Sequence, residues 1–358
     1  MRLAVIGVGL IGGSIGLAAR AHLPSATVSG FDPGAGVLDA ARECGAIDEP
    51  AASVAEALDG AEACFVCAPV GATVELIAEA LAAASPRCVV TDAGSTKRLI
   101  TAATDDERFV GGHPVAGAES AGVQNARADL FEGAAWYLTP GERSSGLLYE
   151  RLHRIVAQLG AHPIAIDAET HDRLLATVSH LPHVLANVLV SQAARALDSA
   201  GEALPRIGPS FRDATRVAGA NPGIWTDIYA TNGELIAAEI EQLSEQLSRV
   251  AADLRSGDRE AIGSWNEAAR GDRRRLLEAE LAGGPVHELR VSVPNRPGIL
   301  AGVALALGKG GVNIVDMALA PAPDNRSGAI TFWVAGDRAA ERARQLLAEL
   351  DLPVMEVS

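Results

Sequence analysis

The stretch Val5-Ile6-Gly7-Val8-Gly9-Leu10-Ile11-Gly12-Gly13-Ser14 decides the fold of the N-terminal part of the chain. An apolar run typical of a buried strand leads through a glycine-rich turn into a helical pattern. The first glycine of such a turn permits a tight bend, the second lets a ligand approach the backbone, and the third permits close packing of helix on strand. Free N–H groups at the helix start attract a diphosphate. We therefore predict a dinucleotide site formed by Gly7, Gly9, Leu10, Ile11 and Gly12.

A carboxylate follows the second candidate strand. Asp32 stands twenty residues after Gly12, at the end of the run 27–31. A carboxylate at this place accepts hydrogen bonds from the ribose hydroxyls and repels a 2′-phosphate, so the expected cofactor is NAD rather than NADP. Ala68 and Pro69, which follow the candidate strand 63–67, are assigned to the same site. An adenine-linked ligand without redox chemistry is the alternative.

The chain divides into three predicted domains. In residues 1–167, helical patterns separate most of the short apolar runs, which predicts βαβ units and a Rossmann-type parallel sheet. The candidate strands are 3–6, 27–31, 63–67, 88–91, 109–112, 135–138 and 162–166. Residues 168–282 have long helical patterns at 168–200, 225–255 and 258–281 and predict an all-helical domain for substrate binding and dimerisation. After the breaker cluster 282–285, residues 286–358 have a βαββαβ order, which predicts a small α+β ferredoxin-like domain.

Composition limits the partners. The 358 residues carry a formal charge of −15, which argues against a nucleic-acid partner or a polybasic membrane patch. The apolar N-terminal run is interrupted by the glycines of the turn, and no other stretch reaches the ~20 apolar residues of a membrane span. We therefore expect a soluble, cytoplasmic protein.

The cysteines and two helical histidines are candidates for a metal. Cys64 and Cys67 lie three apart on a predicted strand and point to opposite faces, so they share neither a metal nor a disulfide. His180 and His183 are placed one turn apart on a helix, a spacing that could hold a metal in principle. We predict no metal site.

Two stretches lie just past strand ends, where open α/β sheets bind their ligands. They are residues 91–97, with Ser95 and Lys97, and residues 111–119, with His113 and Glu119. His113 is flanked by glycines that admit a substrate, and the pKa of a histidine lies near working pH. His113 is therefore a candidate general base, although a structural histidine is the alternative.

Several motifs taken together resemble the prephenate/arogenate dehydrogenase family of tyrosine biosynthesis over the first ~280 residues. They are the glycine-rich stretch, Asp92-Ala93-Gly94-Ser95-Thr96-Lys97, Gly112-His113-Pro114-Val115-Ala116-Gly117, Ser179-His180-Leu181-Pro182-His183 and Phe211-Arg212-Asp213-Ala214-Thr215-Arg216. The resemblance implies an NAD-dependent oxidative decarboxylation of prephenate to 4-hydroxyphenylpyruvate in a homodimer. Arogenate as the substrate, and a non-catalytic sensor of NAD and an amino acid, are the alternatives.

The same resemblance assigns roles to individual residues. His113 would accept the proton of the substrate's 4-hydroxyl and Ser95 would bond the same region, while Arg216 would pair with the ring carboxylate. Lys97 and Arg212 are further sources of positive charge for an anionic substrate. The pocket would be lined by His183 and His180, and Glu119 would stand at its mouth, although a solvated loop carboxylate is the alternative for Glu119.

The C-terminal part resembles the ACT domain, a module that commonly binds amino acids. The resemblance rests on a turn and on the start of the following strand: Asn295, Arg296, Pro297, Gly298, Ile299 and Leu300, then Asn313 and Ile314. It implies feedback regulation by tyrosine. The first residue of the turn is usually aspartate, so Asn295 lacks a charge, and a module that serves only assembly is the alternative.

Other dehydrogenases also join a nucleotide domain to a helical one. The 6-phosphogluconate and β-hydroxyacid types resemble each other in using a lysine on the helical domain. The only lysines of this chain are Lys97 and Lys309, which lie outside that domain. Pyrroline-carboxylate reductases do not account for the stretch Gly112-His113-Pro114.

Overall fold

The computed structural model describes residues 1–117, 120–200, 208–280, 286–294, 298–321, 327–352 and 354–355. The chain forms two compact units. The first is made of Met1–Asp172, Asn221–Thr231 and Val286–Ser358, and the second of Arg173–Ala220 and Asn232–Pro285.

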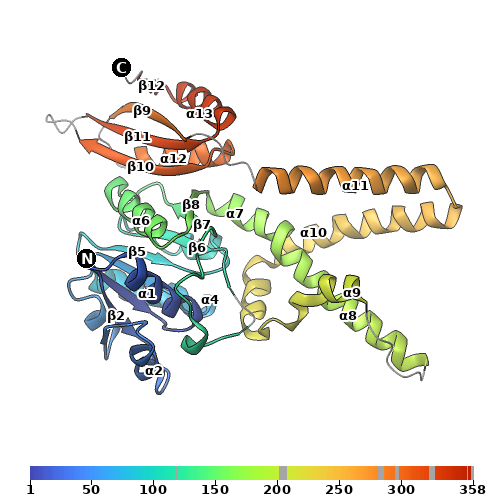
Figure 1. Cartoon of the computed structure of the whole chain (residues 1–358), viewed down its shortest axis with the longest axis horizontal. Helices are drawn as coiled ribbons and strands as arrows, with labels where there is room; N and C mark the ends of the chain where they lie inside the picture. The colour runs from blue at the N-terminus through green and yellow to red at the C-terminus, as the bar shows by residue number, and fades with distance from the viewer. Residues whose placement is uncertain are drawn as a thin grey trace. The chain divides into compact units, whose positions relative to one another are not determined.

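The first unit begins with a five-stranded parallel sheet (Figure 1). Its strand order is β3-β2-β1-β4-β5. Its strands are β1 (Arg2–Ile6), β2 (Thr27–Phe31), β3 (Glu49–Pro50), β4 (Ala63–Val66) and β5 (Val89–Asp92). The order reverses between β1 and β4, which is the switch point at which such sheets bind ligands. The expected Rossmann-type sheet is confirmed, and β3 is a short strand that the sequence did not predict.

Successive side chains of a strand point to opposite faces of the sheet. Because these strands are apolar on both faces, helices cover both. On the face of Leu3 and Val5, the core includes residues of α1 (Leu10–His22) and α2 (Val37–Glu43). On the face of Ala4 and Ile6, it includes residues of α3 (Val54–Ala57) and α4 (Val70–Ala83). The short helix α5 (Arg98–Ala102) follows β5.

Three more strands form a second sheet: β6 (Val110–Pro114), β7 (Ala135–Pro140) and β8 (His162–Ala165). A parallel bridge between Val90 and Phe109 places this sheet beside β5. The pair β6 and β7 is antiparallel, whereas the alternation of strands and helices had predicted parallel strands throughout. In the described part of their connection, a 3-10 turn at Val123–Asn125 replaces the crossover helix that parallel strands need.

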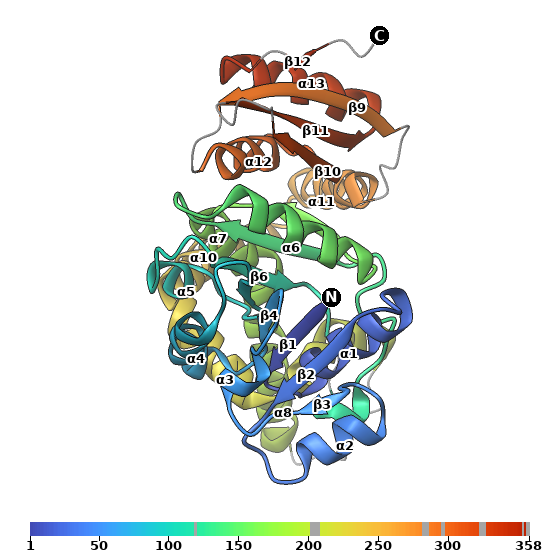
Figure 2. The same ribbon diagram turned by 90° about the vertical axis from the view of Figure 1, so that its left-hand side faces the viewer.

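The C-terminal module has the predicted ferredoxin-like fold. Its elements are β9 (Val286–Pro294), α12 (Ile299–Lys309), β10 (Ile314–Pro321), β11 (Ser327–Ala335), α13 (Asp337–Glu349) and β12 (Val354–Met355). They form an antiparallel sheet in the order β10-β11-β9-β12. Figure 2 shows α12 beside α6 (Gly146–Gln158), the helix that precedes β8.

The second unit is helical, and the first residues of two of its helices, α7 and α10, belong to the first unit. Helix α7 (Ala168–Leu175) continues through a π-helical turn at Ala176–His180 into α8 (Leu181–Ala200). The remaining elements are α9 (Pro209–Thr215), a 3-10 turn (Arg216–Gly219), α10 (Pro222–Ser256) and α11 (Arg259–Glu280). Three predicted helical stretches are confirmed, and α9 was not predicted. Within α10, Asn232 leaves helical geometry, with φ −121° and ψ 18°.

One helical stretch of the described chain, Ala168–Ala196, is long and apolar enough to cross a membrane. This differs from the expectation that no stretch beyond the N-terminal run reaches that length. The stretch also carries the buried polar residues His171, Asp172, His180 and His183. Buried polar groups of this kind are costly in lipid, whereas a helix that packs on protein accommodates them.

Candidate active site

The glycine-rich loop joins β1 to α1 at the switch point of the sheet. Gly7 has a φ of 91°, and a Cβ at this residue would lie 2.7 Å from the carbonyl oxygen of Cys67. A Cβ at Gly12 would overlap the carbonyl oxygen of Gly7. A Cβ at Gly9 would have no neighbour within 4 Å, so the backbone at the start of α1 faces open space. This arrangement of N–H groups and space fits a diphosphate.

Asp32 fixes the loop from the end of β2. Its Oδ2 accepts a hydrogen bond from the backbone N–H of Val8 at 2.8 Å, and its Oδ1 accepts one from Gly34 at 2.8 Å. Each carboxylate oxygen has a further lone pair, which a ribose hydroxyl could use. The half-buried Ala68 and the exposed Pro69 join β4 to α4, as predicted.

A buried ion pair lies at the end of β5. Lys97 and Asp92 are both fully buried, and the Lys97 Nζ contacts Asp92 Oδ2 and donates to the carbonyl oxygen of Gly112 at 2.7 Å. Asp92 also accepts the N–H groups of Gly94 at 2.8 Å and Gly112 at 3.0 Å. Burial lowers the pKa of Lys97, although the charge of Asp92 opposes this shift. Lys97, which the sequence suggested as a source of positive charge for the substrate, is thus buried and paired with Asp92.

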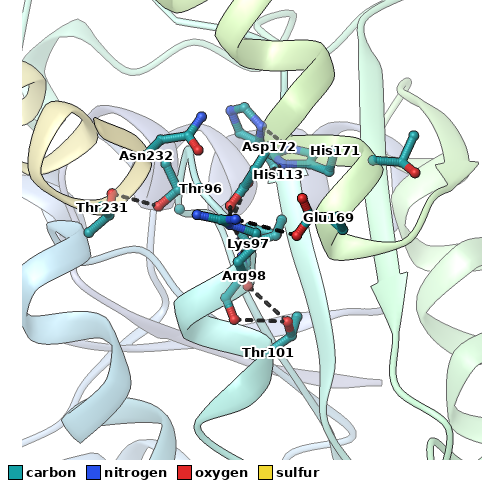
Figure 3. A network of polar contacts seen from close by, with 12 residues as sticks. Thr96, Lys97, Arg98, Thr101, His113, Glu169, His171, Asp172, Thr231 and Asn232 are labelled. Atoms are coloured by element: carbon teal, nitrogen blue, oxygen red, sulfur yellow. Dashed lines mark hydrogen bonds and ion pairs between the residues drawn. The ribbon is translucent and has the colours of Figure 1, made fainter. Parts of the chain in front are cut away.

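A chain of three side chains runs beside this pair and reaches His113. The Nδ1 of His113 lies 2.9 Å from the Nε2 of His171, and the Nδ1 of His171 lies 2.8 Å from Oδ1 of Asp172. Asp172 also accepts the N–H groups of Lys97 at 2.7 Å and Arg98 at 2.9 Å. Figure 3 shows these residues, which come from β6, α5 and α7.

The hydrogen bonds along this chain determine which ring nitrogens of His171 and His113 carry a proton. Burial alone would raise the pKa of Asp172, but the bonds from His171 and from the backbone of Arg98 and Lys97 outweigh it and the pKa is lowered. Burial lowers the pKa of His171, although Asp172 opposes the shift. His171 is therefore neutral and donates its Nδ1 proton to Asp172. Its Nε2 can then only accept, so His113 donates from Nδ1 and carries its basic lone pair on Nε2.

Other predicted residues lie around this chain. Ser95 is half-buried on the loop after β5. His113 is 8% exposed, so it is nearly closed off but still reaches the surface. Glu119 lies outside the described residues.

The substrate-binding candidates lie in the second unit. Arg212 and Arg216 are exposed and stand about one turn apart, at the end of α9 and the start of the following 3-10 turn. His183 is buried and bonds the backbone of Val217 in that turn. Burial lowers the pKa of His183, although this backbone bond opposes the shift. The structure thus brings His183 and the Arg216 segment together.

His180 has a different environment from His183. It is 1% exposed, and its Nδ1 lies 3.1 Å from Nδ2 of the buried Asn232, at the irregular residue of α10. Among the described residues no group of three His, Cys, Asp or Glu side chains could hold a metal.

The sequence did not reveal His171 and Asp172. The available signal was a His-Asp dipeptide in the first turns of a helix that begins directly after a strand. Since the carboxyl ends of neighbouring strands meet at one edge of a sheet, such a dipeptide can face the residues that follow other strands.

Comparisons with known proteins identify the family of the chain. Residues 15–165 match the prephenate dehydrogenase nucleotide-binding domain, and residues 167–266 match the prephenate dehydrogenase dimerization domain. The chain belongs to the prephenate dehydrogenase family.

Individual members of the prephenate dehydrogenase family are similar over most of the chain. The prephenate dehydrogenase of Bacillus subtilis (strain 168) is 28% identical over 95% of this chain and 94% of its own length. That of Lactococcus lactis subsp. cremoris is 31% identical, over 86% of each. A crystal structure of A. aeolicus prephenate dehydrogenase with hydroxyphenyl propionate and NAD+ has a TM-score of 0.70 and 27% identity, and covers 77% of this chain and 98% of that one.

Proposed function

We propose that this chain is an NAD-dependent prephenate dehydrogenase that converts prephenate to 4-hydroxyphenylpyruvate and carbon dioxide in tyrosine biosynthesis. The observation that carries the proposal is the chain His113–His171–Asp172, which presents a basic nitrogen on the strand after β5. The names of the B. subtilis and L. lactis relatives support the substrate, and the A. aeolicus complex supports the cofactor.

The reaction needs a base and charge complementarity. The substrate ring carries a hydroxyl at C4 and a carboxylate at C1, and bound NAD supplies the acceptor for the C4 hydride. His113 Nε2 takes the hydroxyl proton as the C4 carbonyl forms. The C1–carboxyl bond then breaks, its electron pair completes the aromatic ring, and the proton returns to the phenolic oxygen. No metal or covalent nucleophile is required.

The relay behind His113 favours this proton transfer. An imidazolium at His113 keeps its Nδ1 bond to His171, which can accept because Asp172 holds the His171 proton on the far nitrogen. A hydrogen bond to the charged form stabilises that form. Ser95 is assigned to hold the same hydroxyl.

The proposed substrate requires local positive charge. The protein has a net charge of −15, so a dianionic substrate requires local cations. Arg216 is assigned to the ring carboxylate, because a guanidinium can donate two parallel hydrogen bonds to it. Arg212, His183 and His180 are assigned to the substrate pocket as well, and Glu119 is assigned to its mouth.

The glycine loop and Asp32 are assigned to NAD. Gly9 leaves room for the diphosphate, Gly7 and Gly12 hold the turn, and Leu10 and Ile11 begin the helix. Asp32 selects NAD because its charge repels a 2′-phosphate. Ala68 and Pro69 are assigned to the nicotinamide half of the cofactor.

The protein is proposed to act in the cytoplasm as a homodimer formed through the helical unit. It matches a dimerization domain, and its large exposed apolar residues include Val188, Leu189, Leu247, Leu254 and Trp265. Within one chain, only 28% of the most apolar 18-residue window of the helix Ala168–Ala196 is buried. A second copy that covers this helix explains its exposure.

The C-terminal module is proposed to be an ACT domain that binds tyrosine as a feedback inhibitor. In support, Gly298 has a φ of 78° and starts α12, so the turn places Ile299 and Leu300 at a helix N-terminus. Ile314 begins β10, the strand that follows α12 in the chain, and Asn313 directly precedes Ile314. Asn295, Arg296 and Pro297 of the same turn lie outside the described residues.

An assay of NADH formation tests the proposed function. The purified protein is supplied with NAD and prephenate, and in a parallel reaction with NAD and arogenate. We expect NADH and carbon dioxide in equal amounts with prephenate. Faster turnover of arogenate would identify arogenate, rather than prephenate, as the substrate. NAD binding without turnover of either compound would favour a sensor and overturn the enzyme proposal.

A further inference from the structure

Helix α7, which carries His171 and Asp172, is fixed at its start by Asp167. The Oδ1 of Asp167 accepts a hydrogen bond from the backbone N–H of Thr170 at 2.9 Å, and its carbonyl oxygen accepts one from His171 at 2.9 Å. This is the arrangement of a helix N-cap, which satisfies N–H groups that have no partner within the helix.

The other carboxylate oxygen of Asp167 faces the C-terminal module. Its Oδ2 lies 3.3 Å from Nζ of Lys309, the last residue of α12. Burial alone would raise the pKa of Asp167, but the bonds from Thr170 and the charge of Lys309 outweigh it and lower the pKa. Asp167 is therefore ionised and serves both the helix of the catalytic relay and the C-terminal module.

Helix α12 is held to the nucleotide-binding half at both ends. Near its C-terminus, a Cβ at Gly308 would overlap the carbonyl oxygen of Ala165, at the end of β8. At its N-terminus, a Cβ at Gly298 would lie 2.5 Å from the carbonyl oxygen of Glu142. Such close backbone contacts transmit a shift of α12 to the end of β8, from which α7 begins.

We propose that Lys309 and Asp167 are positioning residues that link the C-terminal module to the catalytic relay through the start of α7. The inference rests on the proposed function. Lys309 holds Asp167 in place, Asp167 holds the first turn of α7, and this turn holds the His171 ring at bonding distance from His113. A change in the position of α12 therefore alters the rate of proton transfer without altering the cofactor site.

Two substitutions remove the ion pair between Lys309 and Asp167 and leave the N-cap of α7 in place. Asp167→Asn keeps an oxygen that can cap α7, since Asn is as good an N-cap as Asp, but removes the charge that Lys309 contacts. Lys309→Met removes the cation and keeps the apolar stem. Because the pair is partly exposed, with Lys309 58% and Asp167 25% exposed, each change is expected to lower kcat only about two- to fivefold. The KM for NAD stays unchanged, and Lys309→Arg retains kcat.

The decisive measurement is a double-mutant cycle with His171. If Lys309 acts through the relay, Lys309→Met lowers kcat in the wild type and has no further effect in His171→Ala. Arg344→Met is the matched control, because Arg344 and Glu341 form a pair of similar length, 3.4 Å, within α13 of the same module. It is expected to leave kcat unchanged in both backgrounds.

Two results would overturn the inference. One is an unchanged kcat in Lys309→Met, and the other is an equal loss in the wild type and in His171→Ala. Both require a wild-type protein that turns over prephenate. A wild-type protein without that activity would instead overturn the proposed function, so the two failures are distinguishable.

Discussion

His113 Nδ1 lies 2.9 Å from His171 Nε2, and Asp172 fixes the proton of His171 on its other nitrogen. Together these bonds give His113 a single basic nitrogen, Nε2. A histidine on a flexible loop could present either nitrogen, and only one would meet the substrate hydroxyl. The relay thus supplies the orientation that general base catalysis needs.

Replacement of this base should act on turnover and not on cofactor binding. We expect His113→Asn to lower kcat by about 10²–10⁴-fold, the usual contribution of a general base. The dissociation constant for NAD, measured by calorimetric titration, should stay within about twofold of the wild type. His22→Asn, at an exposed position of α1, is the matched control. Wild-type turnover in His113→Asn would place the base at another residue.

The buried imidazole of His171 predicts a loss of stability in acid. Its pKa is lowered by burial, so below about pH 6.5 the unfolded chain binds a proton that the folded chain does not. The contribution of His171 to the free energy of unfolding should therefore be complete above about pH 6.5. It should fall as the pH drops from there toward the pKa of the folded state. Urea unfolding across this range measures the slope.

The variant His171→Gln should reduce this pH dependence even if it lowers stability at neutral pH. His183 has a pKa lowered in the same direction, so part of the slope will persist. An unaltered slope in His171→Gln would show that His171 is not the group that takes up the proton.

Much of the nucleotide-binding fold was predictable because its signals are local. The glycine turn, the alternating apolar strands and Asp32 each report on a few neighbouring residues, and β1, β2 and β4 lie where the sequence indicated. The antiparallel pairing of β6 with β7 could not be predicted, since the two strands are joined by the long connection 115–134 rather than by a short hairpin turn. The strands themselves were correctly located.

The catalytic relay was only partly predictable. His113 was singled out because the sequence placed it just past a strand in a glycine-flanked motif, whereas in the structure it lies within β6. The partnership with His171 joins positions 58 residues apart and depends on how α7 leaves β8. The pairing of Lys97 with Asp92 could not be predicted either, because a lysine in a ligand-binding loop gives no sign in sequence that it will be buried beside a carboxylate.

Asp32 should control the choice of cofactor through its charge. Because Asp32 also accepts the Val8 N–H, a change to Ala would loosen the glycine loop as well. Asp32→Asn keeps an acceptor and removes the charge. We expect NAD to bind roughly five- to tenfold more weakly, and the preference for NAD over NADP to fall. An unchanged preference, measured as the ratio of kcat/KM, would contradict the assignment.

Arg216 should act on substrate affinity. Its exposed guanidinium is assigned to the ring carboxylate, and loss of a charge-assisted pair should raise the KM for prephenate by about 10- to 100-fold. Arg216→Lys should recover only part of the loss, because an ammonium cannot donate two parallel bonds. Arg249→Ala, in α10, is the control. An unchanged KM in Arg216→Ala would remove Arg216 from this role.

The pair of Lys97 and Asp92 should be the strongest electrostatic contribution to stability near the site. Lys97→Met leaves a fully buried carboxylate with only the N–H groups of Gly94 and Gly112, so we expect a loss of about 3–5 kcal/mol in the free energy of unfolding. The double variant Lys97→Met/Asp92→Asn removes both charges and should be more stable than Lys97→Met alone. Urea unfolding of the three proteins tests this. A double variant less stable than the single one would mean that Asp92 stabilises the loop through its hydrogen bonds rather than through Lys97.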